Sequence, residues 1–419
     1  MRAPFTQLFR GIEPKGTTVF LGSLVALLGQ PADLCAQGLF EQALGGSAPI
    51  DGGSQTVQQS IQAPLTFDSA PLSYELNGSI RADLFVGKQS DYPQGELKSG
   101  EGELSLQFRA RKRPWGDAYA DVRLRGGYQA GQWHPAASVR EAYVNLYLGP
   151  LDVRLGQQIV VWGRADGINP TNNITPQDLS RFSADEDERR LGNVGLRLRS
   201  QWHILQLEAI WMPIYRASRL PQMAIGGPIA LGAPDLPDEK LQHGLAAGRI
   251  SLLGAKFDCS FSYVFGHAPQ PGLAFETLHI TDGQPSIALT LRPYQQHVLG
   301  FDFQTTLANW LGLRGEVAWR QPLDHGQAEH IPAPDVQWVV GLDREFAGHL
   351  HLIAQYHGRA VIDWQAPAAP LSLSELGALP QPLPQAMAAS MEAQIRAEVA
   401  RNAQILHSQT ARWQHAAML

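Results

Sequence analysis

Residues 74–86 read Tyr-Glu-Leu-Asn-Gly-Ser-Ile-Arg-Ala-Asp-Leu-Phe-Val, and this stretch decides the fold class. Successive side chains of a β-strand point to opposite faces, so the stretch predicts a strand with one apolar and one polar surface. A soluble sandwich buries the apolar face against a second sheet, whereas an outer-membrane barrel turns it toward lipid around a polar lumen. The apolar set is Tyr74, Leu76, Ile80, Ala82, Leu84 and Val86, and the polar set is Glu75, Asn77, Ser79, Arg81 and Asp83.

The same alternation recurs along the chain, and the connections between the predicted strands are alternately short and long. Alternating tight turns and long loops are typical of a barrel with short periplasmic turns and longer outer loops. We therefore predict an all-β fold, a transmembrane antiparallel up-and-down β-barrel of about 14 or more strands within residues 73–419. The predicted strands cover residues 73–87, 101–112, 117–128, 138–148, 151–163, 192–200, 203–213, 244–253, 255–266, 295–307, 311–321, 335–345 and 349–363.

The composition fits this class and excludes others. The chain has 419 residues, of which 44% are hydrophobic and 17% are charged, and its net charge is −6. The absence of a basic excess argues against a nucleic-acid partner. No stretch after residue 37 is long and apolar enough for a transmembrane helix, so the predicted membrane partner is outer-membrane lipid reached through strands.

The N-terminal residues 1–36 have the pattern of a signal peptide. Three basic residues precede a short apolar stretch at 18–28, and a cleavage sequence ends at Ala36. Residues 37–72 are rich in Gly, Gln, Ser and Pro and are interpreted as a flexible N-terminal arm or partial plug. Cleavage would leave Cys259 as the single cysteine, so no intrachain disulfide is expected.

Tryptophan residues gather near the ends of the predicted strands. Amphipathic indole rings at both ends fit the two aromatic girdles of a membrane barrel. Trp115, Trp202 and Trp310 are placed at the short-turn end, and Trp162, Trp211 and Trp319 at the long-loop end.

The C-terminal part interrupts the strand pattern. Residues 364–410 are predicted to be a long loop that contains a helical segment, and residues 411–419 look like the opening of a further strand. Because single-chain bacterial barrels close with an even number of strands, we expect that the chain is C-terminally incomplete or that its last strands were lost.

Residues 155–172 form the most distinctive motif, Leu-Gly-Gln-Gln-Ile-Val-Val-Trp-Gly-Arg-Ala-Asp-Gly-Ile-Asn-Pro-Thr-Asn. Here the chain resembles a porin-like family of proteobacterial outer-membrane β-barrels that is distantly like the alginate-export porins. In that family a G-R-Q-x-V-x-W-G strand leads into a loop with I-N-P-x-D. This chain has Gln157 in place of the usual Arg, and Asn172 or Asn173 in place of the Asp. The resemblance implies the location and the fold, and names no solute.

The loop after this motif has two interpretations. Gly163 and Gly167 allow a sharp turn off the strand, and Asn169 with Pro170 fixes the next bend. In one interpretation the loop folds into the lumen and narrows it, and in the other it stays outside as an ordered loop. The composition of the loop is compatible with both. The candidate constriction residues are Trp162, Arg164, Asp166, Asn169, Pro170 and Asp178.

Arginines recur on the polar faces of the early strands. Fixed charges along a pore set its selectivity, so they indicate a weak preference for anionic or hydroxylated solutes. Alternatively, they form a ladder of neutralised pairs with Asp and Glu across neighbouring strands. The predicted pore-lining residues are Arg81, Arg109, Arg123, Arg125, Arg154, Arg197 and Arg199.

The leading functional prediction is a porin-like channel or export conduit for a polar solute. The alternatives are a barrel without a pore that serves as a scaffold for periplasmic export machinery, and a secreted soluble β-rich binding protein. No hydrolase, zinc-protease, phosphate-loop or dinucleotide-binding motif occurs, so no enzyme activity, cofactor or metal is predicted. The oligomeric state is not indicated by the sequence.

Overall fold

The computed structural model describes residues 24–26, 72–89, 92–129, 132–181, 183, 185–220, 229–238, 240, 243–281, 284–308, 310–346, 350–368 and 385–418. Most of the predicted signal peptide and all but the last residue of the predicted N-terminal arm lie outside these residues. Both assignments therefore stay predictions.

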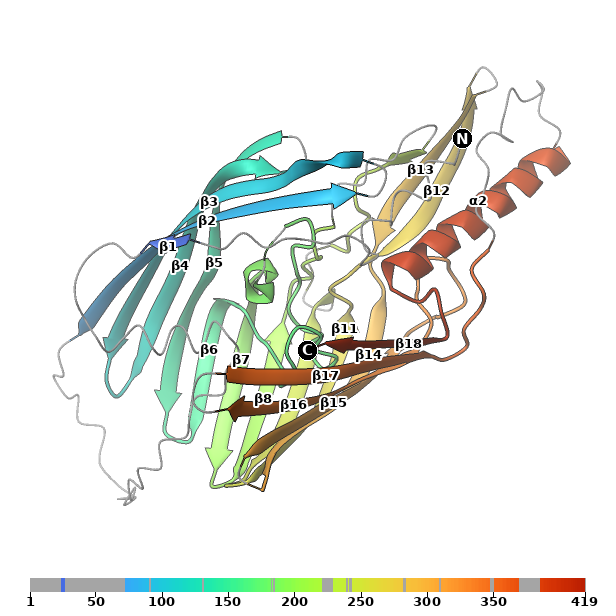
Figure 1. The fold of residues 1–419 in the computed structure, drawn as a ribbon. Helices are drawn as coiled ribbons and strands as arrows, with labels where there is room; N and C mark the ends of the chain where they lie inside the picture. Colours follow the sequence, from blue (N-terminus) through green and yellow to red (C-terminus); the bar gives the residue numbers. More distant parts are fainter. Residues whose placement is uncertain are drawn as a thin grey trace.

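One large antiparallel sheet of 15 strands dominates the structure and curls strongly on itself (Figure 1). Each strand pairs with its neighbour in chain order, with two steps that skip intervening strands. Among the described residues, no pairing joins the two edge strands β1 and β18. The sheet comprises β1 (Leu24–Ala26), β2 (Ser73–Gln89), β3 (Tyr92–Lys112), β4 (Gly116–Gln129), β5 (Gln132–Leu148), β6 (Leu151–Gln158), β7 (Asn193–Trp202), β8 (Leu205–Met212), β10 (Leu245–Leu253), β11 (Phe257–His267), β14 (Gln295–Leu307), β15 (Leu311–Pro322), β16 (Asp335–Phe346), β17 (Leu350–Val361) and β18 (Trp413–Met418).

The two faces of this sheet are inverted relative to a soluble protein. On paired strands β11 and β14, Phe261 is 59% exposed and Leu299 is 47% exposed, although both are large and apolar. On the opposite, concave face, Ser260 and Asp302 are each 1% exposed. Burying polar groups while exposing apolar ones is unfavourable in water and is the arrangement of a barrel in lipid. The predicted outer-membrane barrel fold is confirmed, and the soluble sandwich is wrong.

Most predicted strands agree closely with the observed ones, but β3 and β5 begin at Tyr92 and Gln132, well before the predicted residues 101 and 138. Two other differences are informative. Strand β6 ends at Gln158, not at residue 163. The chain leaves the sheet there because the Ile159 N–H donates to the Glu141 carboxylate (2.8 Å) and the Val160 N–H donates to the Thr175 hydroxyl (3.0 Å).

The second difference lies in residues 267–294, which the sequence predicts as a loop. They form a hairpin of β12 (Gly272–Thr281) and β13 (Gln284–Arg292), and β13 pairs in parallel with β9 (Ile229–Leu231). The hairpin extends beyond the large sheet at its long-loop end (Figure 1).

Helix α2 (Gln385–Leu406) packs on this hairpin. Its buried side chains Met391, Ile395, Val399 and Ala403 recur every four residues and so share one face of the helix. Ile395 and Val399 form one apolar cluster with Leu273, Phe275, Ile287 and Leu289 of the hairpin. No helix of the described residues is long and apolar enough to cross a membrane.

Candidate functional site

The connection between β6 and β7, residues 159–192, lies inside the curl of the large sheet (Figure 1). We call it the inward segment. Its side chains and backbone contact the polar faces of strands far away in the sequence. The two interpretations of this loop are thereby separated, because the structure places it on the lumen side.

Glu316 on β15 is the main anchor of the inward segment. This carboxylate is 4% exposed and accepts hydrogen bonds from the backbone N–H groups of Arg164, Ala165 (2.5 Å) and Thr171 (3.4 Å). It also accepts from the Thr171 hydroxyl at 2.9 Å. A carboxylate has room for several donors, so one wall residue satisfies four donors of the inward segment.

Two charged residues of the segment extend this anchor along the wall. Arg164 donates to Asp302 of β14 at 2.7 Å, and Asp166 pairs with Arg314 of β15 at 2.9 Å. The Asp166 backbone N–H and C=O also bond the Gln355 amide at 3.1 and 2.7 Å. Burial raises the pKa of Asp166, and Arg314 opposes that shift.

A short helix holds the other end of the inward segment. Glu188, in the 3-10 helix η3 (Glu186–Arg189), is 8% exposed and faces four arginines. Burial alone raises the pKa of Glu188, but the positive charges of Arg123, Arg140 and Arg81 outweigh it and the pKa is lowered. Its ion pairs join Arg123, Arg81 (2.6 Å), Arg181 (3.5 Å) and Arg140 (3.7 Å).

Trp162 corrects the girdle prediction. Its ring is 1% exposed, and its Nε1–H donates to Glu208 of β8 at 2.9 Å. The placement in an outer girdle is wrong because β6 ends before Trp162, and the chain has already turned inward. Of the other five tryptophans predicted for the girdles, four are exposed by 38–53%: Trp202, Trp211, Trp310 and Trp319.

The turn after Trp162 requires glycine. Gly163 has φ +103°, and a Cβ there would lie 2.0 Å from the Asn169 side-chain oxygen. A residue with a side chain is strained in this backbone region. Pro170 is buried, and its carbonyl accepts from the Asn173 amide at 2.7 Å. These contacts give the bend predicted from Asn169 and Pro170 its shape.

Asp178 lies apart from this bend. Its carboxylate pairs with Arg219 at 3.4 Å, in the connection that follows β8, and its backbone N–H donates to the Arg189 carbonyl at 2.6 Å. Its contacts connect two loops, and they do not involve Arg164 or Asp166.

The seven predicted pore-lining arginines are for the most part neutralised. Five pair with a carboxylate: Arg81 with Glu188, Arg123 and Arg125 with Glu103, and Arg197 and Arg199 with Glu208. Arg154 lies 4.0 Å from the Tyr143 ring centre and donates to Asn145, and Arg109 lies over Tyr119. These contacts between strands are those of the ladder of neutralised pairs. The ladder does not include Glu188, a further carboxylate that the inward segment supplies to Arg81 and Arg123.

The acidic partners Glu316, Glu208 and Asp302 were not singled out from the sequence. They stand at polar-face positions of predicted strands, so the alternation pattern contains the signal for their orientation. Their role depends on a segment roughly 50 to 150 residues away, which no local pattern reveals.

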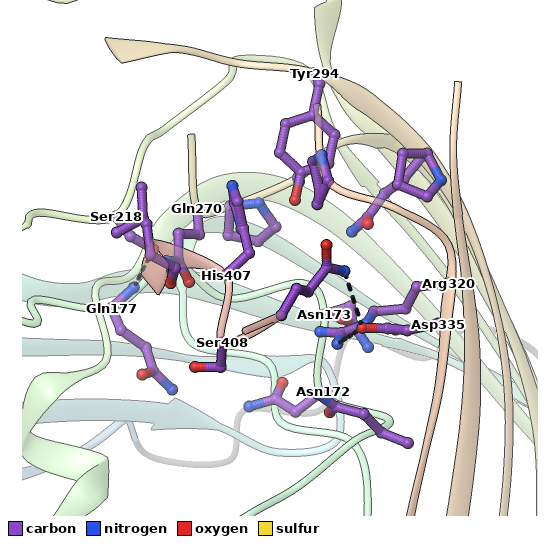
Figure 2. A pocket seen from close by; sticks show the side chains of 18 of the residues that line it. Asn172, Asn173, Gln177, Ser218, Gln270, Tyr294, Arg320, Asp335, His407 and Ser408 are labelled. Atoms are coloured by element: carbon purple, nitrogen blue, oxygen red, sulfur yellow. Dashed lines mark hydrogen bonds and ion pairs between the residues drawn. The ribbon is translucent and has the colours of Figure 1, made fainter. Parts of the chain in front are cut away.

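A polar cavity of about 280 Å³ opens at the long-loop end of the lumen (Figure 2). One wall comes from strands β14 to β17, the facing wall from the inward segment, and the third side from the chain just after α2. Representative lining residues are Asn172, Gln177, Gln296, Arg320, Gln337 and His407.

A family model described as "Protein of unknown function (DUF1302)" matches residues 90–401. The chain belongs to this family. The search of curated proteins found no match.

Several solved outer-membrane proteins are similar in structure at low sequence identity. OmpT of Vibrio cholerae has 9% identity and a TM-score of 0.39 over 70% of this chain and 77% of that one. The outer membrane channel DcaP of Acinetobacter baumannii has 10% identity and a TM-score of 0.38, over 71% and 81% of the two chains. OpdQ of Pseudomonas aeruginosa has 12% identity and a TM-score of 0.36, over 69% and 65%. The fold assignment rests on the strand pairing and inverted faces of this chain.

Proposed function

We propose that this protein is an outer-membrane channel that passes small polar solutes through a lumen narrowed by the inward segment. The observation that supports it is the polar concave face of the sheet, against which residues 159–192 lie. A polar interior surrounded by an apolar exterior is the arrangement that lets water and polar solutes cross a bilayer.

The proposed selectivity is a weak preference for anions. Around Glu188 the charges balance, because five arginines (Arg81, Arg123, Arg125, Arg140 and Arg181) face five carboxylates (Asp83, Glu101, Glu103, Asp121 and Glu188), so the excess of positive charge lies elsewhere. Near β8, Arg197 and Arg199 share Glu208. Paired charges cancel most of each other's field, so a small net excess favours a modest preference over strict selection.

Planar-bilayer recordings of the purified protein test the proposal. We expect stepwise conductance and, in a KCl gradient, a reversal potential that gives an anion-to-cation permeability ratio modestly above one. Arg199→Gln leaves Arg197 to pair with Glu208 and should lower this ratio. Gln107→Leu, a neutral change on the polar face of β3, serves as the control. A ratio at or below one removes the anion preference.

A complete absence of current would remove the channel proposal and leave the scaffold alternative. A scaffold would bind its periplasmic partner through the connections at the short-turn end, and the described connections there are short and expose little surface. For example, β5 and β6 are joined by Gly149 and Pro150 alone, and β7 and β8 by His203 and Ile204.

A further inference from the structure

We infer that the cavity of about 280 Å³ at the long-loop end is a binding site for a small hydroxylated carboxylate, of the sugar-acid class. This inference rests on the proposed channel function and names a solute class for it. The site lies between the strand wall and the inward segment (Figure 2).

The wall strands provide one unit of net positive charge. Arg320 donates to both oxygens of Asp335 at 2.7 Å, through Nε and Nη2, and Arg359 donates to the same carboxylate through Nε at 2.6 Å. Two guanidinium groups thus share one carboxylate, so one positive charge is left for a single anionic group. Arg320 uses two of its three nitrogens in this pair, which leaves Nη1 to bind a carboxylate oxygen.

The rest of the lining is rich in side-chain amides. Each amide offers both donors and an acceptor, the combination that suits hydroxyl groups. The inward segment provides Asn172, Asn173 and Gln177, and the other elements provide Gln270, Gln296, Gln337 and Gln409. Four of these amides, Asn173, Gln177, Gln270 and Gln409, already donate to oxygens of the protein.

Two buried polar atoms in the lining have no hydrogen-bond partner among the described residues, the Asn172 side-chain oxygen and the His407 Nε2 atom. Buried polar atoms are normally satisfied, and a site that awaits a ligand is one reason for exceptions. Burial, with help from Arg359 and Arg320, lowers the pKa of His407 to about 3, so this ring is neutral at physiological pH. An amide oxygen and a neutral imidazole can each accept from a hydroxyl, which favours a hydroxylated ligand over a simple fatty acid.

The size of the cavity limits the ligand. Small-molecule pockets run from roughly 300 to 1,000 Å³, and this cavity, at about 280 Å³, lies just below that range. It therefore fits a single sugar acid better than an oligosaccharide.

Isothermal titration calorimetry on the full chain in detergent tests the inference, with D-gluconate, D-glucose and hexanoate as probes. We expect gluconate to bind, and both glucose, which lacks the carboxylate, and hexanoate, which lacks the hydroxyls, to bind at least tenfold more weakly. Gln337→Leu and Gln296→Leu, tested separately, should each weaken gluconate binding roughly twofold to tenfold, as expected for one lost hydrogen bond. Gln107→Leu makes the same change on the polar face of β3, outside the cavity lining, and should leave the affinity unchanged.

Heat-modifiable migration on gels checks that each variant is folded. If only one of the two cavity variants folds, that variant alone is enough for the test. No gluconate binding, equal binding of hexanoate, or unchanged affinity in a folded cavity variant would each overturn the inference. Calorimetry does not require conduction, so a channel that conducts without binding gluconate removes only this inference. Binding without conduction removes the channel proposal.

Discussion

Replacing Glu316 by Gln should release the inward segment from the wall. The carboxylate accepts from three backbone N–H groups and one hydroxyl, and the amide keeps one acceptor oxygen while its NH₂ faces donors. If about two hydrogen bonds are lost at roughly 1 to 1.5 kcal/mol each, the docked state is destabilised by about 2–3 kcal/mol. The ratio of released to docked segment then rises roughly 30-fold to 150-fold.

Limited trypsin digestion measures this ratio, because cleavage after Arg164 requires this end of the segment to leave its partners. When opening and closing are fast relative to cleavage, the cleavage rate follows the population of the open form. We expect cleavage after Arg164 to accelerate by the factor above. Glu345→Gln, at an exposed position near the short-turn end of β16, is the matched control and should cleave at the wild-type rate. A folded Glu316→Gln protein that is cleaved within threefold of the wild-type rate would refute the anchoring role of Glu316.

Three further predictions follow from the same geometry. Gly163→Ala should destabilise the turn by about 1–3 kcal/mol, because residue 163 has φ +103° and a Cβ there would clash with Asn169. The urea midpoint of unfolding should fall, and an unchanged midpoint would contradict the predicted backbone strain. Leu299→Arg, on the apolar face, should reduce the free energy of folding into lipid vesicles by about 2–4 kcal/mol, whereas Gln107→Arg on the polar face should not. Equal effects would contradict the assigned orientation of the faces. Because the pKa of Glu188 is lowered, its ion pairs stabilise docking at pH values above the ordinary value of 4.5 and weaken only as the pH falls below it. Single-channel conductance should therefore stay constant from pH 8 to about 5, and a change near pH 6 would show that another group controls docking.

Much of the fold could be predicted from residues close together in the chain. Alternation along 295–307 and 311–321 gave strands that match β14 and β15 within one residue, because the period of two is fixed by backbone geometry. The sequence interpretation of residues 267–294 as one loop is wrong, although the alternating apolar residues Leu273, Phe275, Ile287 and Leu289 indicate the two strands of the hairpin.

The candidate site could be predicted only in part. Gly163, Asn169 and Pro170 mark a sharp bend in any context, and the structure contains that bend. The girdle position assigned to Trp162 was wrong because the chain leaves the sheet at Gln158, in response to Glu141 and Thr175. Those partners lie 18 and 15 residues from the atoms they bind, beyond the reach of a strand pattern.

The sequence by itself determined which face of each ribbon is apolar, because neighbouring side chains on a strand must point in opposite directions. Only the tertiary structure decided where residues 159–192 lie and which charges remain unpaired. Those outcomes depend on Glu316, Asp302 and Glu208, which the curvature of the sheet brings to the segment across as many as 152 positions of the chain. A buried charge is stable only beside its partner, so the position of that partner in space, not in sequence, sets the shape of the lumen.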